Sequence, residues 1–452
     1  FDYVFAKKTG GNFIVRIEDT DKARFVEGAE EVIKTSLDWF GLTPDESPWQ
    51  DGKFGPYRQS ERLSIYQKYV QGLIDKKLAY YCFCTKERLG EMRKEQEEKK
   101  EPSMYDKHCL ILTEAEIKKN LSSGVEKVVR MVVPPNRKIV VQDVLAGEVE
   151  FDSNLIDHQV LLKADEFPTY HLAVVVDDYL MKITHVFRGQ EWLPSTPKHV
   201  LLYQYFGWEK AMPQFIHLPL ILNAEGGGKL SKRHGHASVE FYRREGYLPE
   251  AVLNYLANIV WNHPGGKEIF PFSDLGQAFE IENGGKIKKI NISNSGARFD
   301  LRKLDWVNGE YIRKAQNSEL KTKIFEFLGG KYPEDKIEKI VPLVKERIKK
   351  LSEFEPLTRF LFSDEIIYGT DLIINKDLLK SAFSVLEKLE GWESNKIEET
   401  LRKLALDLSV KPADIFTTIR NAISGSKVTP PLFESLEILG KERTLSLLQK
   451  FS

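Results

Sequence analysis

The sequence predicts an α/β protein whose parallel sheet domain is split by an α+β insertion and followed by an all-helical C-terminal region. Three observations lead to this prediction. An apolar strand at 13–17 is followed by an amphipathic segment at 27–40, the strand–helix alternation of a parallel sheet. The alternation stops near residue 63 and returns at 183–187. Beyond residue 306, nearly every segment has the apolar period of a helix.

The first strand and helix place a candidate site at the edge of the sheet. Residues 13–17 follow a glycine turn, and apolar residues then recur at helical spacing across 27–40, with Gly41 as the C-terminal cap. Ligands of parallel sheets bind outside the carboxyl ends of the strands. Glu18 and Asp19 are expected at such an end.

The segment from about 63 to 169 interrupts the sheet domain. It carries a highly charged helical stretch at 86–100 and two β-like runs, at 128–133 and 138–141. A proline-rich turn separates the two runs. This pattern indicates an insertion between two halves of the sheet.

The second half of the sheet domain begins with a strand at 183–187. Gly189 forms a turn, and a helix starts near Ser195 with Pro197 in its first turn. The pattern is mixed and mostly helical to about residue 305, and the remainder is helical and lysine-rich.

Composition narrows the class of protein. A chain of 452 residues with 42% hydrophobic and 29% charged residues predicts a globular protein of several domains. No apolar run approaches the ~20 residues of a membrane helix, and no signal peptide is visible. With 66 basic and 67 acidic residues, charge alone neither supports nor excludes a nucleic-acid partner. Three cysteines favour a reducing compartment, and we expect a cytoplasmic protein.

All three cysteines fall in one window, as Cys82-x-Cys84 and Cys109. Thiolates two residues apart can direct a short loop at one ion, and a third from a distance can close the site. Zn²⁺ takes four such ligands in structural sites. The alternative is three buried free cysteines with no metal.

A glycine run at 226–228 precedes Lys229-Leu230-Ser231-Lys232-Arg233. Glycine lets the backbone approach an anion, and each lysine ammonium is a compact positive charge, so this loop suits a polyphosphate. The alternative is an ordinary solvated basic turn.

Together with other motifs, this loop resembles the bacterial glutamyl-tRNA synthetases, which are class I aminoacyl-tRNA synthetases. The motifs run in family order along essentially the whole chain: RIEDTDKAR at 16–24, GPYRQSER at 55–62, PTYHLA at 168–173, RGQEWL at 188–193, KLSKR at 229–233, FDLRKLDW at 299–306, PLFE at 431–434 and LGKER at 439–443.

The resemblance implies a Rossmann-like class I catalytic domain and a layout of five segments. These are the first half of the catalytic domain at 1–62, an acceptor-end-binding insertion with a zinc site at 63–169, the second half of the catalytic domain at 170–222, a stem-contact domain with the KLSKR loop at 223–305, and a helical anticodon-binding region at 306–452.

The implied reaction joins L-glutamate to ATP as glutamyl-adenylate and then to the 3′ end of tRNA(Glu), with Mg²⁺ accompanying ATP. Fixed positive charge holds the phosphate in the transition state, so Lys229, Ser231 and Lys232 are the implied catalytic residues. Glu191 and Lys232 are implied to bind ATP.

The implied glutamate ligands are Glu18 for the ammonium, Arg188 for a carboxylate, Tyr170 as a hydrogen-bonding partner and Trp192 in the pocket wall. Structural alternatives are a core position for Trp192 and a surface ion pair between Glu18 and Arg24. The acidic pair Asp177 and Asp178 could help hold Mg²⁺ or cap a helix, and we favour the structural role. The family commonly has Asn at the position of Val174, and this departure leaves details of the pocket open.

For the metal, the family often uses Cys-x-Cys with Cys-x-His, but Ile111 stands where that His belongs. A related enzyme that glutamylates a modified tRNA base uses a Cys, Cys, Tyr, Cys set. The resemblance therefore implies Cys82, Cys84, Tyr105 and Cys109 as ligands of a structural Zn²⁺, with His108 as the alternative to Tyr105.

For tRNA, the resemblance implies contacts from Arg24 and from Arg347, which falls near the family's anticodon-reading arginine. The alternative for Arg347 is a solvated basic helix face. We expect a monomer with no membrane association.

One departure concerns the start of the chain. The family opens with a strand, a loop and a helix bearing a His-x-Gly-His signature, whereas residues 2–8 resemble the end of the helix that follows it. The resemblance therefore implies a further N-terminal segment. The alternatives in function are glutamyl transfer to a modified tRNA base by a paralogue and a non-catalytic tRNA-binding relative.

Overall fold

The structure is a computed structural model that describes residues 1–21, 24, 26–223, 238–293, 297–363 and 365–451. The chain forms two compact units, which are described separately. Unit 1 comprises Phe1–Lys229, Ala257–Lys267 and Pro271–Phe299, and unit 2 comprises Leu230–Leu256, Glu268–Phe270 and Asp300–Ser452. No helix in the described part of the chain is long and apolar enough to cross a lipid bilayer.

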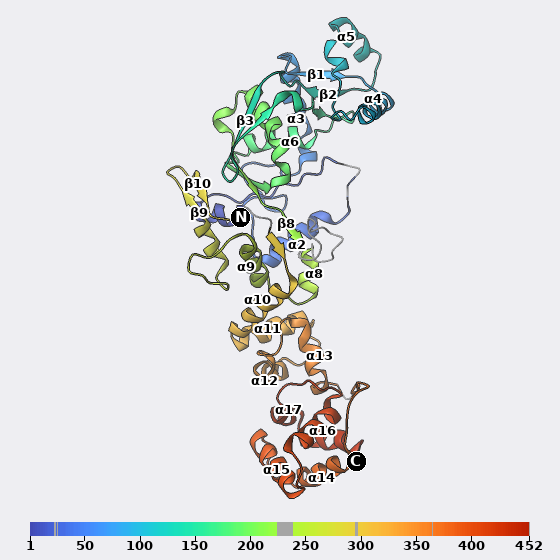
Figure 1. The fold of residues 1–452 in the computed structure, drawn as a ribbon, viewed down its shortest axis with the longest axis vertical. Coiled ribbons are helices and arrows are strands. Elements are labelled where there is room, and N and C mark those ends of the chain that lie inside the picture. The colour runs from blue at the N-terminus through green and yellow to red at the C-terminus, as the bar shows by residue number, and fades with distance from the viewer. Residues whose placement is uncertain (22–23, 25, 224–237, 294–296, 364, 452) are drawn as a thin grey trace. The chain divides into compact units, whose positions relative to one another are not determined.

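The largest sheet of unit 1 has four strands in the order β4-β3-β7-β6. The strands are β3 (Lys138–Asp143), β4 (Gly147–Asp152), β6 (His185–Gly189) and β7 (Gln214–Leu218). β3 and β4 form an antiparallel hairpin, whereas β7 runs parallel to both β3 and β6. The Rossmann-like sheet predicted from the sequence is thus present, and it includes a hairpin from the segment expected to be an insertion (Figure 1).

The segment at 13–17 is extended but forms single parallel bridges instead of a strand. Ile14 pairs with Glu46 and Ile17 with Arg58. Ile17 donates its backbone N–H to Tyr57 at 2.9 Å and accepts from Gln59 at 3.0 Å. The segments opposite are irregular, so the pairing does not extend into a ladder.

Two helices flank this segment in the chain. They are α1 (Asp2–Thr9) and α2 (Ala29–Phe40). α2 ends at Gly41, whose φ of 67° is the left-handed conformation that the predicted glycine cap requires.

The main core of unit 1 lies around three further helices, α3 (Leu63–Asp75), α6 (Tyr170–Leu180) and α7 (Thr196–Phe206). α6 packs against both α3 and α7, and α7 packs against β3. α6 is buried at every position from Leu172 to Asp178, and residues 172–176 are apolar on all sides of the helix. Its last turn therefore carries two carboxylates into the interior.

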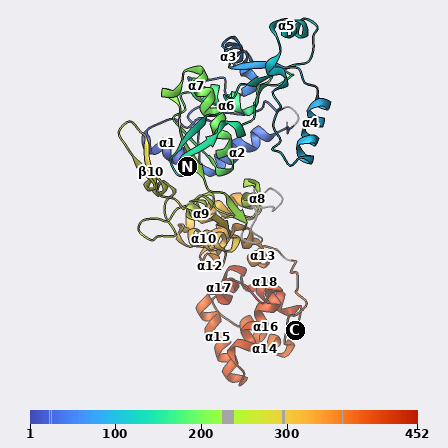
Figure 2. The ribbon, with the colours of Figure 1, turned by 45° about the horizontal axis from the view of Figure 1, so that its top comes forward.

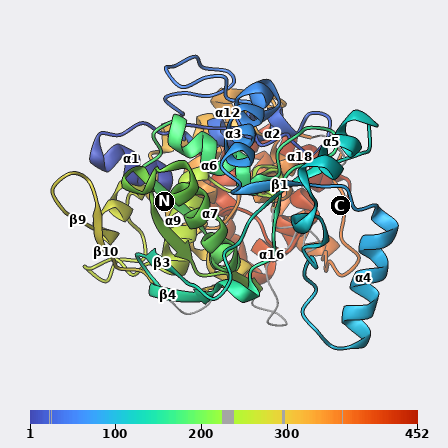
Figure 3. The same cartoon turned by 90° about the horizontal axis from the view of Figure 1, so that it is seen from above.

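The cysteines lie in a smaller lobe of unit 1. Its antiparallel sheet has the order β1-β2-β5, from β1 (Ala79–Cys82), β2 (Val128–Met131) and β5 (Val160–Leu162). The lobe also carries the charged helix α4 (Lys86–Glu98) and α5 (Glu114–Ser122), which starts with a capping box of Thr113 and Glu116. Figure 3 shows α4 and α5 on the side of unit 1 away from α1.

The rest of unit 1 contains short paired strands. β8 (Ile221–Asn223) pairs in parallel with β11 (Ala297–Phe299), and β9 (Phe279–Ile281) pairs with β10 (Ile287–Ile290) as a hairpin.

The C-terminal region is helical, as predicted (Figure 2). The helices after β8 are α8 (Val239–Arg244), α9 (Pro249–Val260), α10 (Leu301–Lys314), α11 (Asn317–Phe327), α12 (Glu334–Val344), α13 (Phe354–Thr358), α14 (Lys376–Glu387), α15 (Ser394–Asp407), α16 (Pro412–Ser424), α17 (Leu432–Leu439) and α18 (Lys441–Gln449). Apolar residues at helical spacing form the core, as in α15, where Ile397, Leu401 and Leu404 are buried.

Candidate active site

A cavity of about 740 Å³ opens in unit 1 between α1, the extended segment, α6 and β6. It brings together three of the predicted glutamate ligands, Glu18, Tyr170 and Arg188. Val174 also lines it, at the position where the family commonly has Asn.

Glu18 is held by a charge network that reaches into the core. Its carboxylate accepts from Arg16 Nη2 at 3.2 Å, while Arg16 Nη1 donates to Asp178 at 2.9 Å and Arg16 Nε lies 3.6 Å from Asp177. Burial lowers the pKa of Arg16, but Asp178, Asp177 and Glu18 outweigh this effect and raise it above its ordinary value. The guanidinium is therefore a fixed cation behind Glu18.

Asp177 is fully buried in the last turn of α6 and accepts three further hydrogen bonds. The donors are Arg62 Nε at 2.8 Å, Tyr66 Oη at 2.8 Å and Gln59 Nε2 at 2.9 Å. The preferred structural role of the acidic pair thus holds, but capping is wrong, because both residues lie in the C-terminal turn and act as ion-pair partners.

Arg188 is the next-to-last residue of β6, and its guanidinium lies within hydrogen-bond distance of four side chains. Nη1 donates to Tyr170 Oη at 3.2 Å and lies 3.4 Å from His199 Nδ1, and Nη2 donates to Thr196 Oγ1 at 2.7 Å. Nε donates to His217 Nε2 at 3.0 Å. Burial raises the pKa of Tyr170, so its hydroxyl keeps its proton.

Trp192 and Glu191 lie just after β6, in the short helix η5 (Gln190–Ser195). The Trp192 ring lies 4.9 Å from the Tyr170 ring, centroid to centroid. Trp192 is 40% exposed, so the alternative of a core residue is wrong. Glu191 is exposed, and its carboxylate lies so close to Gly189 that a Cβ there would be 2.0 Å from one oxygen.

Arg24, a predicted tRNA contact, does not line this cavity. Arg24 is highly exposed and pairs with Asp21 at 3.2 Å, so the alternative pair with Glu18 does not form. Lys229, Ser231 and Lys232 lie outside the described residues.

The sequence analysis missed the side chains that orient Arg188. Thr196, His199 and His217 lie within hydrogen-bond distance of its guanidinium, and Asp143 bonds to His217. The one available signal was a histidine within the apolar run Gln214–Leu218, since a polar residue in a buried strand needs a partner.

The cysteine cluster gathers as predicted. The Sγ atoms of Cys82, Cys84 and Cys109 all lie within 4.8 Å of one another. Tyr105 Oη lies 3.4 Å from Cys82 Sγ and 3.3 Å from Cys84 Sγ. A hydrogen bond from Cys109 lowers the pKa of Cys82 to about 4, and burial raises the pKa of Tyr105. His108, the alternative ligand, is exposed.

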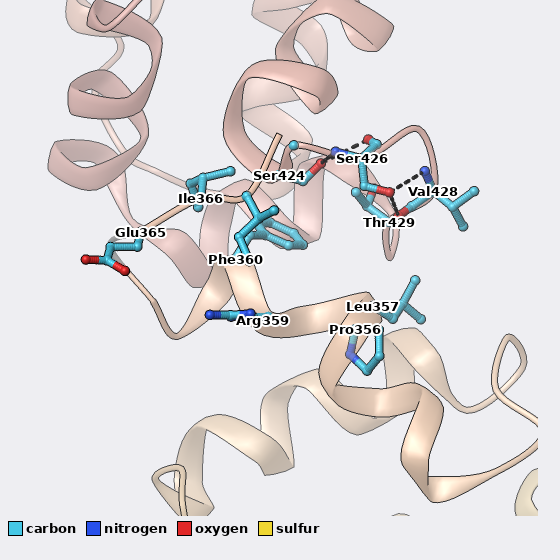
Figure 4. Close-up of a pocket in the computed structure, with 12 residues that line it drawn as sticks. Pro356, Leu357, Arg359, Phe360, Glu365, Ile366, Ser424, Ser426, Val428 and Thr429 are labelled. Carbon is cyan, nitrogen blue, oxygen red and sulfur yellow. Dashed lines mark hydrogen bonds between the residues drawn. The ribbon is translucent and has the colours of Figure 1, made fainter. Parts of the chain in front are cut away.

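Arg347 lies beyond α12 on the surface of unit 2. Burial lowers the pKa of Arg420 on α16, and the positive charge of Arg347 lowers it further. Arg420 Nε donates to Thr429 Oγ1 at 3.2 Å. Thr429 lines a cavity of about 190 Å³ together with Ser424, Ser426 and Val428 (Figure 4).

We compared the chain with known protein families. Residues 1–306 match the catalytic domain of the class I tRNA synthetases (E and Q). The chain belongs to this family. Residues 318–451 match a second family, described as an anticodon binding domain.

The similarity to individual members of this family extends over nearly the whole chain. A glutamate–tRNA ligase of Dehalococcoides mccartyi is 43% identical across 98% of this chain and 92% of its own length. One of Treponema denticola is 39% identical across 100% of this chain and 94% of its own. The crystal structure of a glutamate tRNA ligase from Elizabethkingia meningosepticum, in complex with its amino acid, is 34% identical. It has a TM-score of 0.85 and covers 99% of this chain and 94% of that one.

Proposed function

We propose that this protein is a glutamate–tRNA ligase, which activates L-glutamate with ATP and transfers the glutamyl group to the 3′ end of tRNA(Glu). The observation that carries the proposal is one cavity lined by both the Glu18 carboxylate and the Arg188 guanidinium. A free amino acid presents an ammonium and a carboxylate, and Glu18 and Arg188 carry the opposite charges that each group needs. The relatives described above, similar over the whole chain, supply the substrate.

The reaction requires no nucleophile from the protein. A carboxylate oxygen of glutamate attacks the α-phosphorus of ATP, and pyrophosphate leaves. Negative charge develops on the phosphate oxygens, so preorganised positive groups lower the barrier. We assign this role to Lys229, Ser231 and Lys232, with Lys232 and Glu191 also contacting ATP and Mg²⁺ accompanying its phosphates.

The described side chains account for binding the amino acid. Arg16 orients the Glu18 carboxylate towards the substrate ammonium. Tyr170 Oη accepts from Arg188 and keeps its own proton, which it can donate to a substrate oxygen. Trp192 packs on the Tyr170 ring, and Tyr170 lines the pocket.

We propose a structural Zn²⁺ held by Cys82, Cys84, Cys109 and Tyr105. The donor spacing supports it: tetrahedral Zn–S bonds of about 2.3 Å put sulfur atoms about 3.8 Å apart. The Sγ atoms of Cys84 and Cys109 lie 3.5 Å apart, and the phenol oxygen of Tyr105 is slightly closer to Cys84 Sγ and Cys82 Sγ, at 3.3 and 3.4 Å. A closed set of this kind would support the fold of the lobe and take no part in the chemistry.

We propose that tRNA contacts both units, through Arg24 in unit 1 and Arg347 in unit 2. Arg420 bonds to Thr429, and the charge of Arg347 acts on Arg420. Such positive charge suits an RNA phosphate or an unstacked base. Replacing Arg347 with Ala should weaken tRNA(Glu) charging, and parallel assays with tRNA(Gln) would show whether it also sets anticodon preference. Unchanged rates on both tRNAs would make Arg347 ordinary surface charge. We expect a cytoplasmic monomer.

Charging assays test the function directly. The full-length protein should attach glutamate, and not glutamine, to a tRNA(Glu) transcript in the presence of ATP. Periodate oxidation of the tRNA should abolish the reaction, because it destroys the 3′-terminal diol. Glutamylation that survives periodate would instead indicate transfer to a base.

The Lys232→Ala variant adds a control for catalysis. It should lose about 10²-fold or more in rate while binding tRNA as the wild type does, because the ammonium acts in the transition state. Tight tRNA binding by a wild-type protein that charges nothing would indicate a non-catalytic relative.

A further inference from the structure

The function proposed above depends on where the Arg188 guanidinium points, because a planar fork binds a carboxylate well in one orientation. Rotation about its terminal bonds would misdirect it. Two of its nitrogens donate to hydroxyl groups, of Tyr170 and Thr196, and hydroxyls can rotate to follow a moving donor. The third, Nε, donates to an imidazole nitrogen of His217, whose direction is fixed by the ring.

His217 can accept this bond only if its Nε2 carries no proton. The other ring nitrogen, Nδ1, lies 2.7 Å from Asp143 Oδ2. An ionised carboxylate can only accept, so the proton of the neutral ring sits on Nδ1 and the Nε2 lone pair faces Arg188. The side chains of His217 and Asp143 are 1% and 0% exposed, so water does not compete for these bonds.

Asp143 is itself tightly held in one orientation. Oδ1 accepts from the backbone N–H groups of Leu145 at 2.9 Å and Ala146 at 2.7 Å. Oδ2 accepts from the backbone N–H of His217 at 3.0 Å as well as from its ring. Burial raises the pKa of Asp143, but the bonds from His217, Ala146 and Leu145 outweigh it and leave the pKa lowered.

We propose that Asp143 and His217 are positioning residues that set the direction of the Arg188 guanidinium for a substrate carboxylate. The chain Asp143–His217–Arg188 crosses the sheet from β3 through β7 to β6, where Arg188 and His217 are paired in register. This inference rests on the proposed function of the cavity. Asp143 and His217 are buried and do not touch the substrate, but they control how tightly the substrate carboxylate binds to Arg188.

The Asp143→Asn variant separates positioning from packing, because it is nearly isosteric. If the amide NH₂ takes the place of Oδ1, it faces the backbone N–H groups of Leu145 and Ala146. If it takes the place of Oδ2, it faces the backbone N–H and the ring N–H of His217. Backbone N–H groups cannot change, but the imidazole can move its proton from Nδ1 to Nε2 and accept from the amide. The new Nε2 proton can be donated to Thr196 Oγ1, which lies 3.1 Å away. Arg188 Nε, 3.0 Å from the same nitrogen, then loses its acceptor and faces an N–H, so the guanidinium must turn away.

The complementary variant is His217→Gln. Its amide oxygen can accept from Arg188 while its NH₂ donates to Asp143, so the direction of both bonds survives although the ring is lost. Asp152→Asn is the matched control, since Asp152 lies on the adjacent strand β4, is exposed, and only caps a short turn.

Steady-state charging of tRNA(Glu) by the full-length protein tests the proposal. We expect Asp143→Asn to raise KM for glutamate about 10-fold or more, because a small misplacement of a binding group has a large effect. KM for ATP and for tRNA should stay within about twofold, His217→Gln should lie closer to the wild type, and Asp152→Asn should match it. In protein labelled with ¹⁵N-histidine, NMR should report the Nδ1–H tautomer of His217, and the Nε2–H tautomer in Asp143→Asn.

Two results would overturn the proposal while leaving the function intact. One is an unchanged KM for glutamate in Asp143→Asn with the tautomer switched. The other is a purely structural pattern, in which the unfolding midpoint falls, all three KM values stay constant and His217→Gln is at least as damaged. A wild-type protein that does not charge tRNA with glutamate would instead contradict the proposed function.

Discussion

Tyr105 stands at the fourth corner of the cysteine cluster, and its phenol is also covered by Arg130, whose guanidinium carbon lies 4.0 Å from the ring centre. We expect Tyr105→Phe to weaken zinc binding at least about 10-fold, because it removes one of four ligands but leaves the packing of the ring. Competition with a chromophoric chelator measures this affinity.

His108→Ala is the control for that experiment and should bind zinc as tightly as the wild type, since His108 is exposed. Zinc held with full affinity by Tyr105→Phe would reject Tyr105 as a ligand. A dialysed wild-type protein free of zinc would reject the metal site itself.

His158 makes the stability of unit 1 sensitive to acid. Burial lowers the pKa of His158 from 6.5 to about 4. Its Nε2 accepts from the Val133 backbone N–H at 3.3 Å, so protonation would set two donors against each other. Below about pH 6.5 the unfolded chain binds a proton that the folded chain does not, and stability falls as the pH drops towards 4.

We expect His158→Gln to be less stable than the wild type at pH 7 but to lose stability less steeply between pH 6.5 and 4. The slope should fall by at most about 1.4 kcal/mol per pH unit, the value for one proton. Urea unfolding at a series of pH values measures it, with the exposed His108→Gln as control. An identical slope in His158→Gln and the wild type would show that other groups dominate the acid response.

At the scale of residues, the sequence predicted the side chains that line the cavity better than those that orient them. Glu18, Tyr170 and Arg188 were predicted from motifs, and the structure gathers them in one cavity. Asp143 and His217 were missed because they are 74 positions apart, and only the pairing of β3 with β7 joins them. A sequence does not display the register between distant strands.

At the scale of elements, most predicted helices and strands lie within about two residues of the observed ones, including β2, β3 and β6, and the exception is the first strand. α2 and α4 begin and end within a few residues of expectation, since helical periodicity and capping residues are local signals. The expected strand at 13–17 forms isolated bridges, because its pairing depends on the irregular segments around Glu46 and Arg58.

Helix α16 ends at Gly425, a glycine in the left-handed backbone conformation. Gly425 has a φ of 68°, and a Cβ there would be 2.1 Å from the carbonyl oxygen of Ile367. Gly425→Ala should therefore cost about 1–2 kcal/mol for the left-handed backbone and a further ~1–3 kcal/mol for the clash.

Gly329→Ala provides the matched comparison within unit 2. Gly329 has a φ of 63°, and a Cβ there would meet nothing within 4 Å, so the backbone cost of about 1–2 kcal/mol should act alone. Chemical denaturation of both variants measures the difference. Equal losses would show that the loop carrying Ile367 moves aside without cost.

At the scale of the whole molecule, amino acid binding and tRNA recognition are expected to be separable. Every residue that lines the cavity near Arg188 belongs to unit 1. A deletion beginning at residue 306 would cut α10, whose Asn308 accepts from the Leu248 backbone N–H at 2.8 Å. A deletion beginning at 315 keeps that helix whole.

We expect the protein truncated before residue 315 to bind ATP within about threefold of the full-length affinity and to lose about 10²-fold or more in tRNA charging, because the helical region is removed. Calorimetric titration and charging assays measure the two. Equal loss of both activities in a truncated protein that keeps its circular dichroism would contradict separability.

The pairing of β3 with β7 also limits how this protein can be recombined with its relatives. A chimera that exchanged residues 63–169 as a cassette would replace β3, and with it Asp143, while keeping the host's His217 and Arg188. Such a graft would need an acceptor at the same point of the incoming strand, or the host would keep its own pocket residues with the arginine misdirected. Segments that look transferable in sequence therefore depend on one another through the Asp143–His217 hydrogen bonds and the backbone pairing of β3 with β7.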